Sequence, residues 1–309
     1  GDVVLVESGE YDEYVNLNSS GAQVKGITAA VRVTGRRVYF PATTDLSSVS
    51  TDGLDFVYLF RSRVSNNGVY QVTARGPDYV ETEASFLAEE GAAGDVMQLS
   101  AAIGRPVVIA HVGPGEAVVR RGFYMEKHDF NIMMGLTIRD SVQGFNMQKG
   151  GRFNVIFRNR VERITESNAI QIGFSTASNP NLYNVIANNV IVDSRLEGIY
   201  IGAGGQGPAN NYTDHTHILN NTIHTTDGHK LENAIDLKEF NQGTVVEGND
   251  IYDITLKSSG NGAIDVREEH DHVLIYGNRI ENVRSDGSPY QLQERSGAGC
   301  PKQSLLFGP

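Results

Sequence analysis

Cysteine and tryptophan are almost missing from this sequence of 309 residues: Cys300 is its only cysteine, and it has no tryptophan. A single cysteine excludes an intrachain disulfide and leaves the redox compartment undecided. Long hydrophobic runs are missing too, since none approaches the roughly 18 residues of a membrane-spanning helix, so we expect no membrane span. No charged-then-apolar leader opens the chain at Gly1 and Asp2, which indicates a mature or trimmed start.

Positive charge is also scarce. The chain has 26 Lys and Arg against 37 Asp and Glu, which gives a formal net charge of −11. Recognition of nucleic acid normally needs a basic surface. We therefore expect no nucleic-acid partner, although a small basic site within an acidic protein remains compatible with this balance.

What the second half does have is a repeated phrase, Asn followed after one residue by Ile or Val. Successive Asn residues lie 30, 32, 28 and 29 positions apart, and a steady period of this size indicates stacked repeats. We expect each Asn to occupy a bend, to bond the Asn of the next coil through its amide, and to adopt the left-handed conformation. The five positions are Asn159, Asn189, Asn221, Asn249 and Asn278.

Each repeat also contains a short run that reads small, apolar, polar, apolar, polar. Strict alternation is typical of a strand with one buried face. Units built only of strands and Gly/Asn-rich turns bury a core by stacking, so the fold class is all-β, a single-stranded right-handed parallel β-helix. The runs are 144–148, 169–173, 198–202, 234–238 and 263–267, with a sixth at 288–293.

We interpret residues 1–309 as a single β-helix domain. Residues 1–35 form an opening coil, 36–101 are irregular or inserted, 106–293 form the regular coils, and 294–309 form a cap or tail. Within the irregular part, Leu87–Ala93 is expected to be a loop or a short helix.

The alternating runs can be aligned with one another, because the buried apolar pair fixes the phase of each strand. The outward positions carry charge on only two neighbouring coils, and Glu239 and Glu268 follow them directly. Gly173 and Gly202 would leave an open floor for a sugar chain. Opposite charges on neighbouring strands are also common as plain surface pairing. In order, the outward pairs are Asn146/Gln148, Gln171/Gly173, Tyr200/Gly202, Asp236/Lys238, Asp265/Arg267 and Gln291/Gln293.

The segment Glu232–Lys238, followed one coil later by Ala263–Arg267, resembles the parallel β-helix polysaccharide lyases of the chondroitinase B and alginate lyase type. The resemblance implies that Lys238 is the base that removes the C5 proton of a uronic acid. It also implies that Arg267 neutralises the uronate carboxylate, which is the electrostatic work this elimination demands. Tyr200, one coil earlier, is our candidate proton donor to the leaving oxygen.

Further residues would contact the substrate or a metal. We expect substrate contacts from Asp236, Asp265, Gln171, Glu268 and His229. The resemblance also implies calcium, a hard cation that prefers oxygen ligands. A pectate-lyase-like β-helix with bound calcium is a related possibility. The candidate calcium ligands are Glu232, Asp236, Glu239 and Asp265.

Two other functions fit the same residues. Asp236 and Asp265 on neighbouring coils could be the carboxyl pair of a glycoside hydrolase. A non-catalytic carbohydrate-binding or structural β-helix is the third alternative; the absence of tryptophan favours it slightly, although 13 tyrosines can serve as sugar platforms. Our prediction is a secreted or extracellular lyase that cleaves a uronic-acid-containing polysaccharide by β-elimination.

Overall fold

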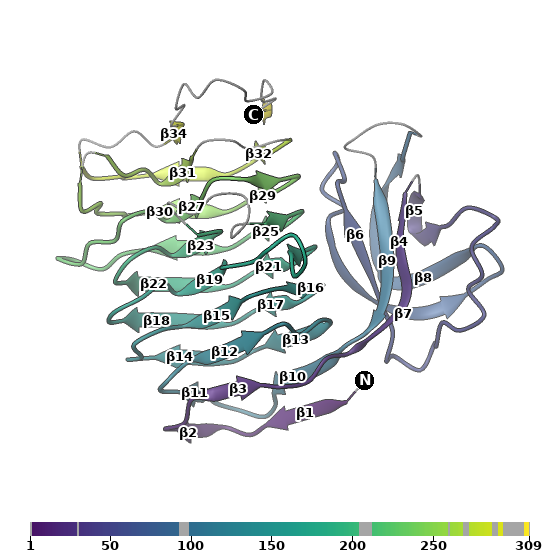
Figure 1. The fold of residues 1–309 in the computed structure, drawn as a ribbon, viewed down its shortest axis with the longest axis horizontal. Coiled ribbons are helices and arrows are strands. Elements are labelled where there is room, and N and C mark those ends of the chain that lie inside the picture. The colour runs from purple at the N-terminus through teal and green to yellow at the C-terminus, as the bar shows by residue number, and fades with distance from the viewer. Residues whose placement is uncertain are drawn as a thin grey trace.

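The computed structural model describes residues 2–29, 31–92, 99–203, 212–258, 260–267, 272–285, 290–292 and 306–308. Its strands form a tall stack of coils beside a separate antiparallel sheet (Figure 1). Across these ranges no α-helix occurs, and hence no helix that could cross a membrane.

Three parallel sheets, which we call A, B and C, run the height of the stack, and each coil contributes one strand to each sheet. Sheet A contains β1 (Val3–Val6), β10 (Val107–His111), β13 (Asn131–Met134), β17 (Val155–Phe157), β21 (Val185–Ala187), β25 (His217–Leu219), β29 (Val245–Glu247), β32 (Leu274–Tyr276) and β35 (Leu306–Gly308). Sheet B contains β2 (Gly9–Tyr11), β11 (Ala117–Val119), β14 (Thr137–Arg139), β18 (Arg160–Ile164), β22 (Val190–Ser194), β26 (Thr222–His224), β30 (Asp250–Tyr252) and β33 (Arg279–Glu281).

Sheet C carries the alternating runs. It contains β3 (Val15–Leu17), β12 (Phe123–Glu126), β15 (Phe145–Gln148), β19 (Ile170–Gly173), β23 (Ile199–Ile201), β27 (Ile235–Leu237), β31 (Ile264–Val266) and β34 (Tyr290–Leu292). A fourth, short sheet contains β16 (Gly151–Arg152), β20 (Asn181–Leu182), β24 (Thr213–Asp214) and β28 (Asn241–Gln242). The chain is therefore a parallel β-helix, as its periodicity predicts.

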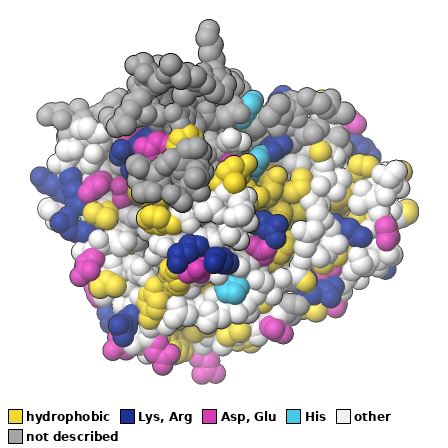
Figure 2. Space-filling view, in the orientation of Figure 1, with side chains coloured by type: hydrophobic (Ala, Val, Ile, Leu, Met, Phe, Trp, Pro, Cys, Tyr) yellow, Lys and Arg dark blue, Asp and Glu magenta, His cyan; other side chains and the backbone are white. Residues whose placement is uncertain are grey.

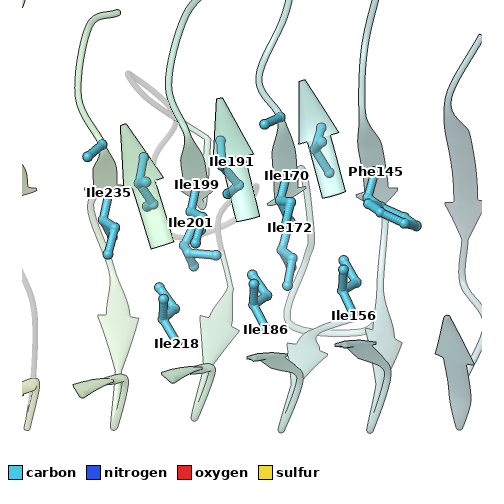
Figure 3. Close-up of a cluster of buried hydrophobic side chains, with 14 of the residues drawn as sticks. Phe145, Ile156, Ile170, Ile172, Ile186, Ile191, Ile199, Ile201, Ile218 and Ile235 are labelled. Atoms are coloured by element: carbon cyan, nitrogen blue, oxygen red, sulfur yellow. The ribbon is translucent and has the colours of Figure 1, made fainter. Parts of the chain in front are cut away.

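Columns of isoleucine fill the interior of the stack (Figure 3). Ile170, Ile199 and Ile235 are register partners on consecutive strands of sheet C, and all three are fully buried. Burying one such side chain contributes about 1.5–3 kcal/mol. A slip of one residue would turn the whole column outward, so the core also fixes which side chains of sheet C face solvent.

The repeated Asn residues form the expected ladder between sheets A and B. The amide of Asn189 donates to Oδ1 of Asn221 at 2.9 Å, and the amide of Asn221 donates to Oδ1 of Asn249 at 3.0 Å. The prediction that these residues adopt the left-handed conformation is wrong. The residue before each Asn adopts it instead, as at Asn188 (φ 56°) and Asn220 (φ 53°), because the chain turns there before the ladder begins.

Residues Ala22–Arg105 form an inserted antiparallel sheet with its own core of Val33, Leu59, Val72 and Ile103. The insertion begins before Arg36, where the sequence indicated its start. Leu87–Glu90, expected in a loop or a short helix, ends a strand instead. The sheet has the order β4 (Ala22–Ala29), β9 (Ser100–Arg105), β6 (Phe56–Phe60), β7 (Gly68–Arg75), β8 (Tyr79–Glu90) and β5 (Arg32–Tyr39).

The inserted sheet packs on the outer face of sheet A and its adjoining turns. The ring of Phe60 lies 5.1 Å from the ring of Tyr183 and 6.1 Å from that of Phe153. Asn67 donates a hydrogen bond of 3.1 Å to Oε2 of Glu247. Hydrophobic side chains follow the junction of the two parts (Figure 2). Among the described residues, the hydrophobic contacts of this junction involve sheet A and its turns and not the outer face of sheet C.

Candidate active site

Two columns of side chains follow the outer face of sheet C, and the register expected from the sequence is confirmed. Tyr200 pairs with Asp236, and Asp236 pairs with Asp265. Lys238 and Arg267 each follow their Asp by two residues, so they are also neighbours. The alternation of β27 and β31 therefore places two carboxylates and two cations together.

Three ion pairs join these four side chains. Nζ of Lys238 is in direct contact with Oδ2 of Asp236. Nε of Arg267 lies 3.7 Å from Oδ1 of Asp236 and 3.7 Å from Oδ2 of Asp265. Asn233 donates a hydrogen bond of 3.1 Å to Oδ2 of Asp236. Asp236 is thus the centre of the group, with both cations beside it.

Burial shapes the charge of this group. Asp236 and Asp265 are fully buried, and only 6% of the Lys238 side chain is exposed, against 30% for Arg267. Burial raises the pKa of Asp236, and Lys238 opposes the rise. Burial and the charge of Asp236 raise the pKa of Asp265 to about 6, although Arg267 counteracts. Burial disfavours the charge of Arg267, but Asp236 and Asp265 outweigh it and raise the Arg267 pKa.

Glu197 is a member of the group that the alternating pattern does not reveal. Its Oε1 lies 4.0 Å from Nζ of Lys238, and the residue is 4% exposed. Burial, followed by the charge of Asp236, raises its pKa to about 8. A sequence signal for Glu197 exists at the position just before each alternating run. The neighbouring coils have Asn168 and Asn233 there, whereas this coil has the carboxyl of Glu197.

The other expected site residues lie at different distances from the group. The ring of Tyr200 lies over Lys238, with Nζ 5.0 Å from its centroid. Gln171 pairs with Tyr200 on the coil before. His229 lies in the turn between sheets B and C, where its Nε2 is 2.8 Å from the carbonyl oxygen of Ser194. Glu268 lies outside the described residues.

Two expectations about the surrounding face need correction. Gly173 and Gly202 do not form an open floor: both are buried, and a Cβ on Gly173 would collide with the carbonyl oxygen of Gly202. These glycines are needed for close packing of the coils. The face is also not neutral elsewhere, because Glu126 on β12 points outward and pairs with Lys149 at 3.2 Å. That coil precedes the first alternating run.

The expected calcium ligands do not form a calcium site. Glu232 is paired with Lys257 at 3.5 Å. Lys238 and Arg267 occupy the positions beside Asp236 and Asp265 that a calcium ion would need. Across the described ranges, no group of three or more His, Cys, Asp or Glu residues is arranged to hold a metal. The donor set therefore does not fit calcium.

Chemically, the group can hold and move protons. Both oxygens of Asp265 and the Nε of Arg267 are buried and have no hydrogen-bond partner within the described part of the chain. With its pKa raised to about 8, Glu197 favours the protonated form at neutral pH, and the carboxylates beside the two cations are then Asp236, Asp265 and, next to Arg267, Glu239. A group with raised carboxyl pKa values and unused hydrogen-bonding atoms is typical of a functional site.

No protein-family model and no curated protein matches this sequence. Among solved structures, the chain is similar to an alginate lyase from Paenibacillus sp. str. FPU-7, with a TM-score of 0.42, 17% identity, and coverage of 66% of this chain and 83% of that one. It is also similar to the tailspike of Acinetobacter baumannii bacteriophage AP22, solved in complex with capsular saccharide (TM-score 0.37, 8% identity, coverage 99% and 63%). A tailspike of Pseudomonas phage phi297 is similar at a TM-score of 0.26 and 10% identity, with coverage of 98% and 70%. At these identities the likeness concerns the fold alone.

Proposed function

We propose that this protein is a polysaccharide lyase that cleaves a uronic-acid-containing polysaccharide by β-elimination at the group on β27 and β31. The observation that carries the proposal is the placement of Lys238 and Arg267 in register on neighbouring coils, with Tyr200 one coil before them. Elimination beside a carboxylate needs a base, a cation for the carboxylate and a proton donor for the leaving oxygen. These three side chains supply the three roles.

Arg267 is the residue that the substrate carboxylate would meet first. It is the more exposed of the two cations, and its Nε has no hydrogen bond within the described ranges. Guanidinium groups bind carboxylates in a planar, bidentate manner. Bound there, the uronate carboxylate can accept the negative charge that develops when the C5 proton leaves.

Lys238 acts as a base only after its ammonium has lost a proton, and Asp236 is in contact to receive it. The transfer replaces a buried ion pair by a neutral amine and a neutral carboxyl, and burial already raises the pKa of Asp236. The amine then takes the C5 proton. The C4–O bond breaks as the C4=C5 double bond forms, and Tyr200 gives its hydroxyl proton to the leaving oxygen. Lys238 finally returns a proton to Tyr200.

The test is the ultraviolet absorbance of the unsaturated uronate product on alginate, pectate, chondroitin, hyaluronan and glucuronan, with and without a chelator. We expect one of these substrates to give the product with the wild-type protein. Lys238→Gln should lower kcat at least about a hundredfold, since it removes the base and leaves an amide that can still donate to Asp236. Lys257→Gln is the matched control, because Lys257 pairs with Glu232 outside the group.

Unchanged activity of Lys238→Gln would contradict the lyase mechanism. One observation favours a second candidate, a glycoside hydrolase. Neither oxygen of Asp265 has a hydrogen bond within the described residues, and its pKa is raised to about 6, as a general acid requires. Reducing ends that appear without the unsaturated product would support this candidate. If none of the five substrates gives either the unsaturated product or new reducing ends, a non-catalytic carbohydrate-binding β-helix is favoured.

A further inference from the structure

Sheet C has a second unusual surface on its first coils, built from Tyr14 and Tyr124. The two rings are stacked with their centroids 6.3 Å apart and an angle of 27° between their planes. Tyr14 precedes β3 and is 36% exposed, and Tyr124 on β12 is half-buried. Aromatic rings that remain accessible on a polar face are a common platform for the apolar side of a pyranose ring.

Hydrogen bonds hold the two rings in place. The amide of Gln143 donates to the hydroxyl of Tyr14, and its Oε1 accepts a bond of 3.1 Å from Asn146. The hydroxyl of Tyr124 donates to Oε2 of Glu126 at 2.8 Å. A platform whose side chains are already ordered loses little conformational entropy when a ligand binds.

Positive charge lies beside the rings. Nζ of Lys149 is 3.2 Å from Glu126 and Nζ of Lys127 is 3.6 Å from the same carboxylate, so one of the two cations is not neutralised by it. Both lysine side chains are more than half exposed. Such a pair of lysines beside a carboxylate can bind the acid group of a sugar that rests on the rings.

The platform and the catalytic group are members of the same column. Register pairs lead from Tyr124 to Asn146, Gln171, Tyr200 and Asp236, which is four coil steps. At roughly 4.8 Å a step, they are separated by about 19 Å, a length that several linked pyranose rings can span. Between the two ends the column contains the half-buried amide of Asn146, the buried amide of Gln171 and the half-buried ring of Tyr200. Amide donors and acceptors suit sugar hydroxyls.

We propose that Tyr14 and Tyr124, with Lys127 and Lys149, form a distal subsite for an acidic polysaccharide that crosses the strands of sheet C on its way to Lys238. This inference rests on the proposed function. It adds a direction for the bound chain and a minimum length for tight binding. Short oligosaccharides at the catalytic group would not reach the rings, whereas a polymer would.

The experiment compares the kinetics of Tyr14→Ala and of the wild type on two substrates. One is the polymer that gives the unsaturated product in the absorbance test, and the other is a trisaccharide of that polymer. We expect the KM for the polymer to rise about three- to tenfold, as the loss of one aromatic contact implies, with kcat and the trisaccharide KM unchanged. Tyr252→Ala is the matched control, because Tyr252 is also an outward, stacked ring, 5.0 Å from His224 on sheet B. A KM that stays the same, or that rises equally for both substrates, would overturn the subsite.

A binding readout separates this inference from the proposed function. Native electrophoresis through gels that contain alginate or pectate measures affinity whether or not cleavage occurs. If the gel retards the wild type and retards Tyr14→Ala less, the subsite is supported, even when the protein cleaves neither polymer. Equal retardation of both proteins, or no retardation of either, overturns it.

Discussion

Glu197 lies where its ionisation would add a negative charge beside Asp236. Burial keeps it protonated at neutral pH, with a pKa of about 8. Lys238 and Arg267 then have the charges of Asp236, Asp265 and Glu239 beside them. A proton bound at Glu197 therefore limits the negative charge of the buried group, and its loss would act on both Asp236 and Lys238.

The same carboxyl gives a stability prediction with a defined sign. Between its ordinary pKa near 4.5 and the folded value of about 8, the folded protein holds a proton that the unfolded chain has lost. The free energy of unfolding must therefore fall as pH rises through this range, and it levels off above it. Glu197→Gln removes this part of the decline. Chemical denaturation at pH 5 and pH 8 should show a smaller difference for the variant, by at least about 1.4 kcal/mol, the equivalent of one pKa unit.

Asp236 and Asp265 also have raised pKa values, so the variant should retain a shallower decline. Glu166→Gln, which changes an exposed carboxyl on a neighbouring turn, is the control and should follow the wild type. Identical pH dependence in Glu197→Gln and the wild type would show that Glu197 is ionised in the folded protein at neutral pH.

At the scale of the elements, the asparagine ladder joins successive coils. The Asn221 amide donates to the carbonyl oxygen of Ile186 at 2.9 Å and to Oδ1 of Asn249 at 3.0 Å. Its Oδ1 accepts from the backbone and the side chain of Asn189. Because the site is buried, no water can replace these bonds. Each coil therefore depends on the Asn of the next.

Asn221→Ala should lower the free energy of unfolding by about 3 kcal/mol or more, since it leaves several buried donors and acceptors without partners. Thermal or urea denaturation measures the loss. Gln242→Ala, an exposed position on β28, should change stability by less than about 0.5 kcal/mol. A loss at Asn221 no larger than that at Gln242 would mean that the ladder contributes nothing net.

Alternation of apolar and polar residues was sufficient to predict the strands of sheet C, their register and the meeting of Asp236 with Asp265. It could not reveal Glu197, because that residue precedes the alternating run and reaches the group only through the turn of its coil. The inserted sheet was also hidden. Its strands have register shifts, as between Gln23 and Lys25, and they pair across the insertion rather than at a repeating distance, so no period marks them.

At the scale of the whole molecule, the inserted sheet leaves and rejoins the coils at one point. A Cβ on Gly21 would lie 2.5 Å from the carbonyl oxygen of Arg105 and 2.6 Å from Cα of Pro106. Backbone hydrogen bonds of 2.9 Å hold both ends to the next coil, from Gly21 to Asp129 and from Val107 to Phe130. A short linker can therefore replace residues 22–105 without moving either end.

Such a deletion removes the core of the inserted sheet and uncovers the surface of the coils on which that sheet packs. Tyr58 and Phe60 are fully buried at the junction, where they cover Phe130, Phe153 and Tyr183. Their loss should cost about 3–6 kcal/mol of stability and leave an apolar patch on sheet A. We expect the variant to retain the β-sheet circular dichroism and the activity proposed for the group on β27 and β31, but to bind a hydrophobic dye and to self-associate in sedimentation experiments.

Phe60→Ala in the intact chain provides the matched point change, and it should show the same effects in weaker form. A groove of about 560 Å³ lies between the two parts, lined by Gln71 and Glu83 from the inserted sheet and by Met134 and Phe157 from the coils. A deletion variant that stays monomeric and does not bind the dye would show that hydrophobic burial does not hold the inserted sheet in place. Loss of activity in a folded, monomeric deletion variant would instead assign the inserted sheet a part in the site on sheet C.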